Sequence, residues 1–587
     1  MKNALRKNVV ALFFIAVSLI FLVKLFYIQV LNEEYKFSAK NNVLRYDVLQ
    51  PVRGLVFDRD SNLIVSNQPA FDIIVVPREV TKIDTTVFCN SINIQKVDFI
   101  EKLNSAIEYS KYRESIFEKQ IDAITAANFR EKLYQFPGFY LRKVTKRIYP
   151  HKNLGHLIGF MGEVNSKKMK EDDFYIKGDL LGVSGIEASY ENKLRGEKGM
   201  SIRLVDVHNR TQGKFNNGEY DTLAIRGKNL ISTIDIELQK YGNQLLYDKL
   251  GSIVAINPKN GEILSLVSSP NFDPEKLSGK NRSKNYKKLI NNRTKPMFNR
   301  ALLGEYPPGS TFKVINSLIC LQEKTLNVNN FYNCDGKYFF EKDRSVKCHK
   351  HTSKVNLSDA IKYSCNPFFC ENFEKYFNKF DTSEKAYKNW FAHVTSFGIG
   401  DWMNNDFFSG RKGLLPKADY YNNYYGENNW NSSTIISMSI GQGELLITPI
   451  QLANVSAIIA NRGFFYTPHI IKTIENELSI DSNFTNKKFC SVNKEHFKYV
   501  IEGMFDVVNS KNGTAYNAEI ARFNICGKTG TAQNPHGDDH SIYIAFAPKN
   551  NPEIAIAVFI ENAGWGSKWA APIGNNLIQK YFELKDK

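Results

Sequence analysis

The chain has 587 residues, of which 43% are hydrophobic and 23% are charged, and its formal net charge is +17 at pH 7. This globular composition excludes a disordered tail, a collagen-like repeat and a small disulfide scaffold. No basic block interleaved with aromatic residues indicates nucleic-acid binding. The positive charge therefore indicates a surface that faces anionic lipid or anionic polymer, or a solvated lysine-rich surface.

The N-terminus predicts a membrane anchor. Residues 9–31 are largely apolar apart from Lys24, and about 20 apolar residues cross a bilayer. No Ala-x-Ala cleavage pattern follows, which favours an uncleaved anchor over a cleaved signal peptide. The basic flank before this stretch places the N-terminus in the cytoplasm and the rest of the chain outside. The flank comprises Lys2, Arg6 and Lys7.

Three parts are predicted along the chain: a tip and anchor at 1–31, a mixed α/β pedestal at 32–226 and a catalytic part at 227–587. Within the pedestal, β-like runs such as 71–76 alternate with helical, charged stretches such as 111–132.

In the third part, the order of strand and helix patterns indicates a single α/β unit. Strands from the beginning and the end of this part would close its sheet. Two hairpins are predicted, one with its turn at 258–261 and the other with its turn at 548–552. The remaining elements are a strand at 230–235 and helices at 236–250, 449–460 and 572–582.

Eight scattered cysteines are too few for a disulfide framework in a chain of this length. One local group combines Cys334 with Cys348 and His351, residue types that suit zinc. A Cys334–Cys348 disulfide and free thiols are the alternatives, because the spacing fits no standard zinc module.

Ser310 begins a Ser-x-x-Lys pattern that predicts a nucleophile. Pro and Gly before the apolar run 314–321 place Ser310 at a helix N-terminus, with Lys313 one turn further on. A serine hydroxyl needs a neighbouring base. Lysine can serve only when burial lowers its pKa from about 10.4.

Two further motifs follow in order. Ser364-Cys365-Asn366 comes after a helical pattern at 357–363, and Lys528-Thr529-Gly530-Thr531 comes just before the second hairpin. The ordered set Ser-x-x-Lys, Ser-x-Asn and Lys-Thr-Gly is the serine acyl-transfer signature of β-lactamases and penicillin-binding proteins.

On these motifs, the chain resembles the class B penicillin-binding proteins, and among them the elongation type. Further support comes from Arg53-Gly-Leu-Val-Phe-Asp58-Arg59, Gly182-Val-Ser-Gly-Ile-Glu187 with Tyr190, Tyr306-Pro-Pro-Gly, and Gly441-Gln-Gly443. The resemblance implies a serine acyl-transferase fold of the α/β (α+β) class, with a central antiparallel sheet flanked by helices. A mixed α/β pedestal domain and one transmembrane helix would precede it.

The resemblance also implies D,D-transpeptidation of peptidoglycan stem peptides ending in D-Ala-D-Ala. Ser310 would attack the penultimate D-alanine carbonyl with Lys313 as base, and Ser364 would relay protons. Asn366 would hold the donor peptide. Lys528, Thr529, Gly530 and Thr531 would bind the donor, with the N–H groups of Ser310 and Thr531 as oxyanion donors. β-Lactams would acylate Ser310.

The implied setting is a single-pass protein of the bacterial inner membrane with a periplasmic catalytic domain. The expected partner is a SEDS-family glycosyltransferase, for which the pedestal is a docking surface, a spacer, or both. No cofactor is required, and a structural zinc at Cys334, Cys348 and His351 is the one candidate. The alternatives are a septal transpeptidase, a β-lactamase, and a non-catalytic β-lactam-binding scaffold or sensor.

Overall fold

The computed structural model describes residues 2–31, 43–206, 211–279 and 281–586, so the predicted start of the pedestal at residue 32 lies outside the described residues. The chain divides into two compact units that do not follow chain order. Unit 1 comprises 1–53, 68–146 and 195–227; unit 2 comprises 54–67, 147–194 and 228–587. Two segments expected in the pedestal, 54–67 and 147–194, are thus grouped with the catalytic part.

The N-terminal helix α1 (Lys2–Phe26) continues into a π-helical turn, η1 (Tyr27–Leu31). Within the described residues, Arg6–Val30 is the one helix long and apolar enough to cross a membrane, and none of its most apolar stretch is buried. Leucine, isoleucine and phenylalanine side chains left exposed along a whole helix suit lipid rather than water.

The rest of unit 1 is built around an aromatic core. Phe88 of α3 (Thr85–Ile92) is fully buried, and the rings of Phe99, Phe117, Phe129, Phe136 and Phe139 surround it with centroids 4.6–5.4 Å away. Most of these pairs meet edge to face, the arrangement that aromatic quadrupoles favour. The other elements are η2 (Pro77–Glu79), α4 (Lys96–Tyr109), β4 (Ser115–Ile121), α5 (Ala123–Glu131), η3 (Leu133–Gln135), β1 (Leu44–Leu49), β8 (Gly199–Val205), β9 (Thr211–Lys214) and η4 (Phe215–Gly218).

The helical prediction for 111–132 is wrong in its first half, because β4 occupies Ser115–Ile121 and α5 begins only at Ala123. β4 pairs antiparallel with β3 (Leu63–Val75), and Phe117 enters the aromatic core. Tertiary packing of that strand therefore outweighs the helical propensity of its charged residues. The β-like run at 71–76 is confirmed within β3.

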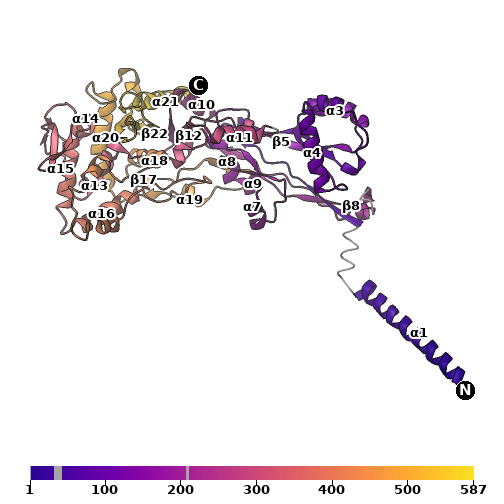
Figure 1. The fold of residues 1–587 in the computed structure, drawn as a ribbon. Helices are drawn as coiled ribbons and strands as arrows, with labels where there is room; N and C mark the ends of the chain where they lie inside the picture. The colour runs from indigo at the N-terminus through magenta and orange to yellow at the C-terminus, as the bar shows by residue number, and fades with distance from the viewer. Residues whose placement is uncertain (1, 32–42, 207–210, 280, 587) are drawn as a thin grey trace. The chain divides into compact units, whose positions relative to one another are not determined.

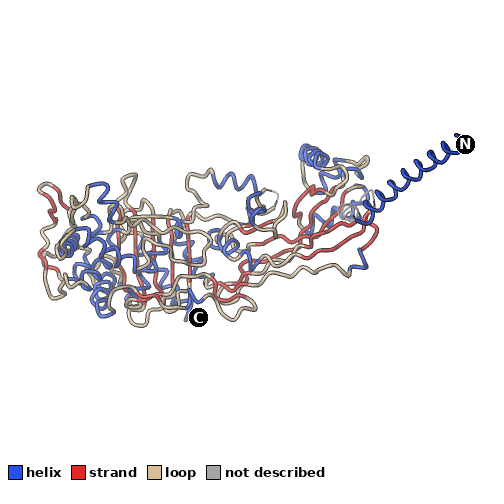
Figure 2. The backbone as a smooth tube through the Cα atoms, turned by 90° about the horizontal axis from the view of Figure 1, so that it is seen from below, coloured by secondary structure: helices blue, strands red, loops and turns tan. Residues whose placement is uncertain are grey.

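Unit 2 contains a five-stranded antiparallel sheet of order β12-β11-β22-β21-β20. Its strands are β11 (Gly251–Ile256), β12 (Ile263–Ser269), β20 (Cys526–Ala532), β21 (His540–Ala547) and β22 (Ile554–Ile560). Figure 2 shows them as red segments side by side. Both predicted hairpins are confirmed as β11–β12 and β21–β22. β11 pairs with β22, so segments from both ends of the unit close one sheet.

Helices pack against this sheet. α10 (Ile236–Leu245) and α21 (Ala570–Lys585) contact each other and the strands, and they lie together in Figure 1. α18 (Pro449–Ala460) contacts β11, β21 and β22, and all twelve of its residues are buried. The predicted helices at 236–250, 449–460 and 572–582 are confirmed, although α10 ends at Leu245.

The remaining elements are short strands and helices of unit 2, together with β5, which lies mainly in unit 1 and ends in unit 2. They are β2 (Val56–Phe57), β5 (Phe139–Ile148, which begins in unit 1), α6 (Gly155–Ile158), β6 (Met161–Glu163), α7 (Ser166–Glu171), β7 (Leu180–Gly182), α8 (Gly185–Ser189), α9 (Glu191–Leu194), β10 (Leu230–Ser232), η5 (Pro274–Leu277), α11 (Arg282–Ile290), α12 (Arg300–Leu303), η6 (Gly309–Phe312), α13 (Lys313–Gln322), β13 (Tyr332–Asn333), β14 (Lys337–Glu341), β15 (Arg344–Lys347), β16 (Lys354–Val355), α14 (Leu357–Tyr363), α15 (Asn366–Phe377), α16 (Ser383–Ser396), α17 (Ala418–Tyr425), η7 (Ile436–Ile440), β17 (Phe464–Phe465), β18 (Ile471–Ile474), α19 (Ser482–Thr485), β19 (Lys488–Phe489), α20 (Lys494–Asn509) and η8 (Ala518–Phe523).

A buried ion pair joins two of the motifs seen in the sequence. Arg147 Nε donates to Glu187 Oε1 at 2.6 Å, and Arg147 Nη1 donates to the Gly54 carbonyl at 2.6 Å. The side chains of Arg147 and Glu187 are 5% and 0% exposed. The guanidinium of Arg147 is removed from water, and an unpaired charge in the interior is strongly unfavourable. It therefore requires the carboxylate of Glu187 and the carbonyl of Gly54 as hydrogen-bond acceptors.

Glu187→Gln removes the negative charge and leaves the Arg147 guanidinium buried without compensation. We expect the free energy of unfolding to fall by about 3–5 kcal/mol, measured by urea titration of the detergent-solubilised chain. Glu237→Gln, in the exposed pair with Lys240, is the matched control and should change stability by less than about 1 kcal/mol. Equal effects of the two substitutions would contradict this account.

Candidate active site

Ser310 lies in the 3₁₀ turn η6, directly before α13. Pro308 precedes the turn and Gly309 takes a φ of +54°, so the chain bends sharply into the helix. Thr311 is fully buried, and its hydroxyl donates to the Pro308 carbonyl at 2.7 Å. The prediction that Ser310 stands at a helix N-terminus is confirmed, and this turn holds the serine half-buried at the start of α13.

Two other sequence motifs, Gly441-Gln-Gly443 and Lys-Thr-Gly-Thr531, approach the backbone of the turn that carries Ser310. The Gly309 N–H donates to the Gly441 carbonyl at 2.8 Å. A Cβ on Gly441 would lie 2.2 Å from the Gly309 oxygen, and one on Gly309 would lie 2.6 Å from the Thr531 oxygen. Gln442 also donates to the Thr531 carbonyl, at 3.3 Å. Glycine is therefore required sterically at both positions.

Lys313 is completely buried at the first position of α13. Its Nζ donates to the Ser364 carbonyl (2.7 Å), to Ser364 Oγ (3.1 Å) and to Asn366 Oδ1 (2.5 Å). Burial lowers the pKa of Lys313 to about 8. An amine with this pKa is partly neutral near neutral pH, and the neutral form is able to accept a proton. Among the described residues, the Ser310 hydroxyl itself makes no hydrogen bond.

The Ser-x-Asn motif occupies the break between two helices. Ser364 ends α14 in the left-handed conformation with φ +58°, and Asn366 begins α15. The Asn366 side chain also donates to the Lys347 carbonyl at 2.7 Å. This bend turns the polar side chains of both motif residues toward Lys313.

The Lys-Thr-Gly motif lies on the edge strand β20, which packs against η6. Lys528 is fully buried, and its Nζ donates to the Thr529 carbonyl at 2.9 Å. Burial, followed by the charge of Lys313, holds the pKa of Lys528 well below its ordinary value. At Gly530 a Cβ would lie 2.9 Å from a Thr311 methyl. Gly530 therefore lets β20 approach the turn that carries Ser310.

Thr514 is a site residue that the sequence did not indicate. Its hydroxyl is hydrogen-bonded to the Thr529 hydroxyl at 2.9 Å, across the loop that follows α20. A single threonine in a polar loop carries no motif, so only the fold brings it to the Lys-Thr-Gly strand. It orients the hydroxyl of Thr529 in the site.

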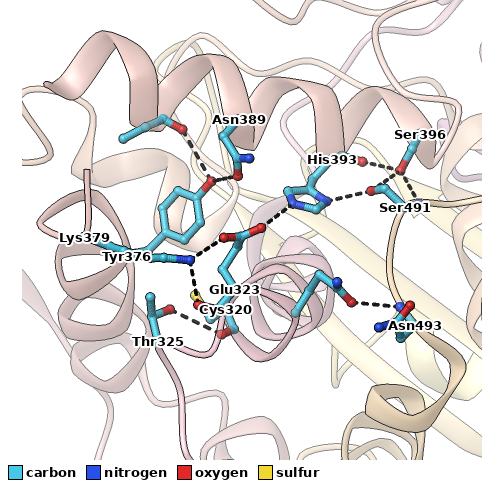
Figure 3. Close-up of polar contacts among 12 residues, drawn as sticks. Cys320, Glu323, Thr325, Tyr376, Lys379, Asn389, His393, Ser396, Ser491 and Asn493 are labelled. Atoms are coloured by element: carbon cyan, nitrogen blue, oxygen red, sulfur yellow. Dashed lines mark hydrogen bonds and ion pairs between the residues drawn. The ribbon is translucent and has the colours of Figure 1, made fainter. Parts of the chain in front are cut away.

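The far end of α13 is held by a polar network, which Figure 3 shows. Glu323, the residue after α13, accepts hydrogen bonds from Lys379 (2.5 Å) and from His393 Nε2 (3.2 Å). His393 Nδ1 in turn is hydrogen-bonded to the Ser491 hydroxyl at 2.6 Å. Despite desolvation, the bonds from Lys379 and His393 lower the pKa of Glu323. The network ties α13 to α15 and α16 and so fixes the helix that carries Lys313.

The cysteine cluster adjoins the Ser-x-Asn motif and is larger than predicted. All eight cysteines, each within the described residues, are free thiols, so the predicted Cys334–Cys348 disulfide alternative is absent there. One ligand atom from each of four residues lies within 4.8 Å of the others: Cys334, Cys348, His351 and Cys365. Cys365, the middle residue of Ser364-Cys365-Asn366, is the member that the sequence analysis missed.

The donor set fits zinc chemically. Three thiols and one imidazole form a common tetrahedral zinc site. His351 Nδ1 is hydrogen-bonded to the Thr352 carbonyl at 2.6 Å, which leaves Nε2 facing Cys348 Sγ at 3.3 Å. A ligating histidine typically donates its other nitrogen to a carbonyl in this way. The hydrogen bond with Cys365 is the main factor that lowers the pKa of Cys348 to about 4, which favours the thiolate.

Comparison with known proteins gives consistent matches. Residues 251–579 match the family model described as "Penicillin binding protein transpeptidase domain", and residues 48–232 match "Penicillin-binding Protein dimerisation domain".

Two curated relatives are both described as "Peptidoglycan D,D-transpeptidase MrdA". The one from Acinetobacter baumannii is 31% identical over 577 residues, 93% of this chain and 82% of the relative. The one from Haemophilus influenzae is 27% identical over 592 residues, 96% of this chain and 89% of the relative.

Two solved structures share the fold. Pseudomonas aeruginosa PBP2 in complex with WCK 5153 has a TM-score of 0.68 and 26% identity, and the match covers 92% of this chain and 96% of that chain. Helicobacter pylori PBP2, solved in a complex with MreC, has a TM-score of 0.76 over 92% of this chain and 99% of that chain. At 24% identity the second likeness is one of fold alone.

Proposed function

Because the chain belongs to the penicillin-binding protein transpeptidase family, we propose that it is a serine-type peptidoglycan D,D-transpeptidase of cell-wall elongation and cell-shape maintenance. The observation that carries the proposal is the convergence of Ser310, buried Lys313, Ser364 and buried Lys528 in one site. MrdA transpeptidases among its relatives favour elongation over the septal alternative.

In the acylation half-reaction, Ser310 Oγ attacks the carbonyl carbon of the penultimate D-alanine. Neutral Lys313 takes the hydroxyl proton, a new C–O ester bond forms, and the C–N bond to terminal D-alanine breaks. Ser364, hydrogen-bonded to Lys313 Nζ, passes the proton to the leaving amine. The positive end of α13 and the N–H groups of Ser310 and Thr531 stabilise the oxyanion.

In the second half-reaction, the amine of a neighbouring stem peptide attacks the ester carbonyl. The C–O bond to Ser310 breaks, an amide cross-link forms, and the serine regains its proton from the attacking amine through Lys313. The two steps use the same base in opposite directions, as microscopic reversibility requires.

Electrostatics favour a substrate that ends in a carboxylate. Lys528 and Lys313 are both fully buried, and each positive charge disfavours the other. A carboxylate bound at Lys528 and Thr529 would restore the charge of Lys528 and satisfy its ammonium. Asn366 and Gly530 would bind the donor backbone, and a β-lactam, which also carries a carboxylate, would acylate Ser310 at the same place.

A structural zinc held by Cys334, Cys348, His351 and Cys365 is part of the proposal. The metal would supply folding free energy by cross-linking the β13–β16 segment to the helix break that carries Ser364 and Asn366. The reaction requires no cofactor, because each step above uses only side-chain and backbone groups.

We place the protein in the bacterial inner membrane, with the N-terminus cytoplasmic and the catalytic unit periplasmic. The support is one exposed apolar helix preceded by a basic flank. A SEDS-family glycosyltransferase is the proposed membrane partner, as the family resemblance implies, and the exposed apolar side chains of α1 leave a surface on which it could pack in the bilayer.

Ser310→Ala should abolish covalent binding of penicillin, because it removes the nucleophile. Intact-protein mass should show a stable penicilloyl adduct on the parent chain and none on the variant. Ser317→Ala, at a buried serine of the helix α13 that follows, is the matched control and should still be acylated. Rapid loss of the adduct would indicate a β-lactamase, and its absence from folded parent chain would indicate a scaffold.

The rate of acylation should rise with pH up to about 8, the pKa of Lys313. Below that pH most Lys313 is protonated and cannot act as base, so the rate should gain roughly tenfold per pH unit and then level off. Timed mass spectra from about pH 5.5 to about pH 9, which spans the range below and above that value, measure this profile. Lys313→Arg keeps the charge but cannot lose the proton. Equal rates for the arginine variant and the parent would contradict the role.

The purified full-length chain should contain about one zinc per molecule, measured by plasma mass spectrometry. Cys365→Ser should lower the zinc content and the melting temperature, because a thiolate ligand is lost. Cys490→Ser is the control, since this buried cysteine lies outside the cluster. If zinc-supplemented growth yields metal-free folded protein, the cluster is only a group of thiols.

A further inference from the structure

The hairpin formed by β14 and β15 places two lysines directly opposite each other. In its antiparallel register Lys337 pairs with Lys347, and both residues are exposed. Opposite residues of such a pair share one face with their Cβ atoms about 4.5–5.5 Å apart, and like charges in this position are destabilising. Among the described residues neither lysine forms an ion pair. The Phe339 ring, whose centroid lies 4.6 Å from Lys337 Nζ, compensates one of the two charges in part.

The other face of this hairpin packs against the protein. Tyr338 and Val346 also lie opposite each other. The Tyr338 hydroxyl donates to Glu374 of α15, a helix labelled in Figure 1, and Val346 packs against the hydrophobic core. Because successive side chains of a strand point to opposite faces, the two lysines project from the face that α15 does not cover. The lysine face is therefore open to a ligand.

A hydrogen-bonded amide connects the hairpin to the candidate active site. Asn366 Nδ2 donates to the Lys347 carbonyl at 2.7 Å, and Oδ1 of the same side chain accepts from Lys313 Nζ at 2.5 Å. Two hydrogen bonds through one side chain thus link the Lys347 backbone to the buried ammonium of Lys313. The hairpin therefore lies at the edge of the site.

The chain beyond β15 stays close to the site. The Cys348 N–H donates to the Gly336 carbonyl at 2.8 Å, so the hairpin ladder continues one residue past the strand. His349 comes next and is exposed. Desolvation lowers the pKa of His349, and the positive charges of Lys313 and Lys528 lower it further, so its ring lies near both lysines of the site. His349 thus stands between these lysines and the lysine face of the hairpin.

We propose that Lys337 and Lys347 bind a carboxylate of the donor peptide that lies upstream of its C-terminus, with His349 beside the same peptide. The inference rests on the proposed function, and it adds a second carboxylate contact to the one at Lys528 and Thr529. Charge complementarity identifies the occupant, because a carboxylate between the two ammonium groups would offset their mutual repulsion. The substrate class is then a peptide that ends in D-Ala-D-Ala and carries an acidic residue upstream.

The test measures peptide binding to the full-length Ser310→Ala chain in a neutral detergent, by fluorescence anisotropy. This variant lacks the nucleophile, so no acyl-enzyme forms. All peptides carry fluorescein and end in D-Ala-D-Ala. One set has a single glutamate at the third, fourth or fifth position from the C-terminus, and the matched set has glutamine there. At one of these positions the glutamate peptide should bind about fivefold more tightly than its glutamine counterpart. Equal binding at all three positions would overturn the proposal.

Protein variants test the hairpin itself. Lys337→Gln, Lys347→Gln, added to the same chain, should bind the glutamate and glutamine peptides alike, because both ammonium groups are lost. Lys494→Gln, Lys498→Gln is the charge-matched control, from exposed lysines of α20, and should keep the preference for glutamate. A preference that persists in the hairpin variant would also contradict the proposal, because the carboxylate would then bind elsewhere.

The melting temperature separates a binding role from a structural one. Lys347→Gln relieves the repulsion with Lys337, so its melting temperature should equal or exceed that of the parent. A fall of more than about 3 °C would show that Lys347 stabilises the fold and would overturn the proposal. Penicillin acylation of the parent chain tests the proposed function separately. The comparison of glutamate with glutamine peptides needs no acylation, so it decides this inference whatever the result with penicillin.

Discussion

The burial of Lys313 is the constraint on which the site depends. An ammonium group removed from water needs several hydrogen-bond acceptors, and here the three are the Ser364 carbonyl, the Ser364 hydroxyl and the Asn366 amide oxygen. All three come from one helix break, so the position of that break is coupled to the start of α13. The same burial lowers the pKa of the amine, and so a single packing arrangement both positions the proposed base and leaves part of it unprotonated near neutral pH.

Two structural devices keep this arrangement in place. On one side, the backbone at Gly309, Gly441 and Thr531 approaches so closely that no side chain could intervene. On the other side, Glu323 joins the end of α13 to Lys379 and His393 (Figure 3). Steric contact at the N-terminal end and ionic hydrogen bonds at the C-terminal end therefore restrain the helix from both directions, as preorganised catalysis requires.

The sequence predicts the sheet and the three motifs well, because hairpin turns, alternating strands and helix-start signals are local. Gly261, in the turn of the first hairpin, has the positive φ that such a turn needs. The sequence predicts helix where β4 forms, because charged residues surround Phe117 in this segment. The residues that pair with the strand and pack against Phe117 are distant in sequence. Thr514 and the membership of Cys365 in the thiol cluster are non-local in the same way. The unit boundaries also depend on tertiary contacts such as Arg147 with Glu187, which composition does not reveal.

Cys365 connects the chemistry of the site with the stability of its surroundings. It lies between Ser364 and Asn366, the two residues that accept hydrogen bonds from Lys313. Any bond formed by its sulfur therefore restrains the backbone at this helix break. Cys334 and Cys348 reach it from the β13–β16 segment, which otherwise consists of short two-stranded sheets with little core of their own. A cross-link through these sulfurs would stabilise that weak segment and the geometry around Lys313 together, and loss of the cross-link should loosen both.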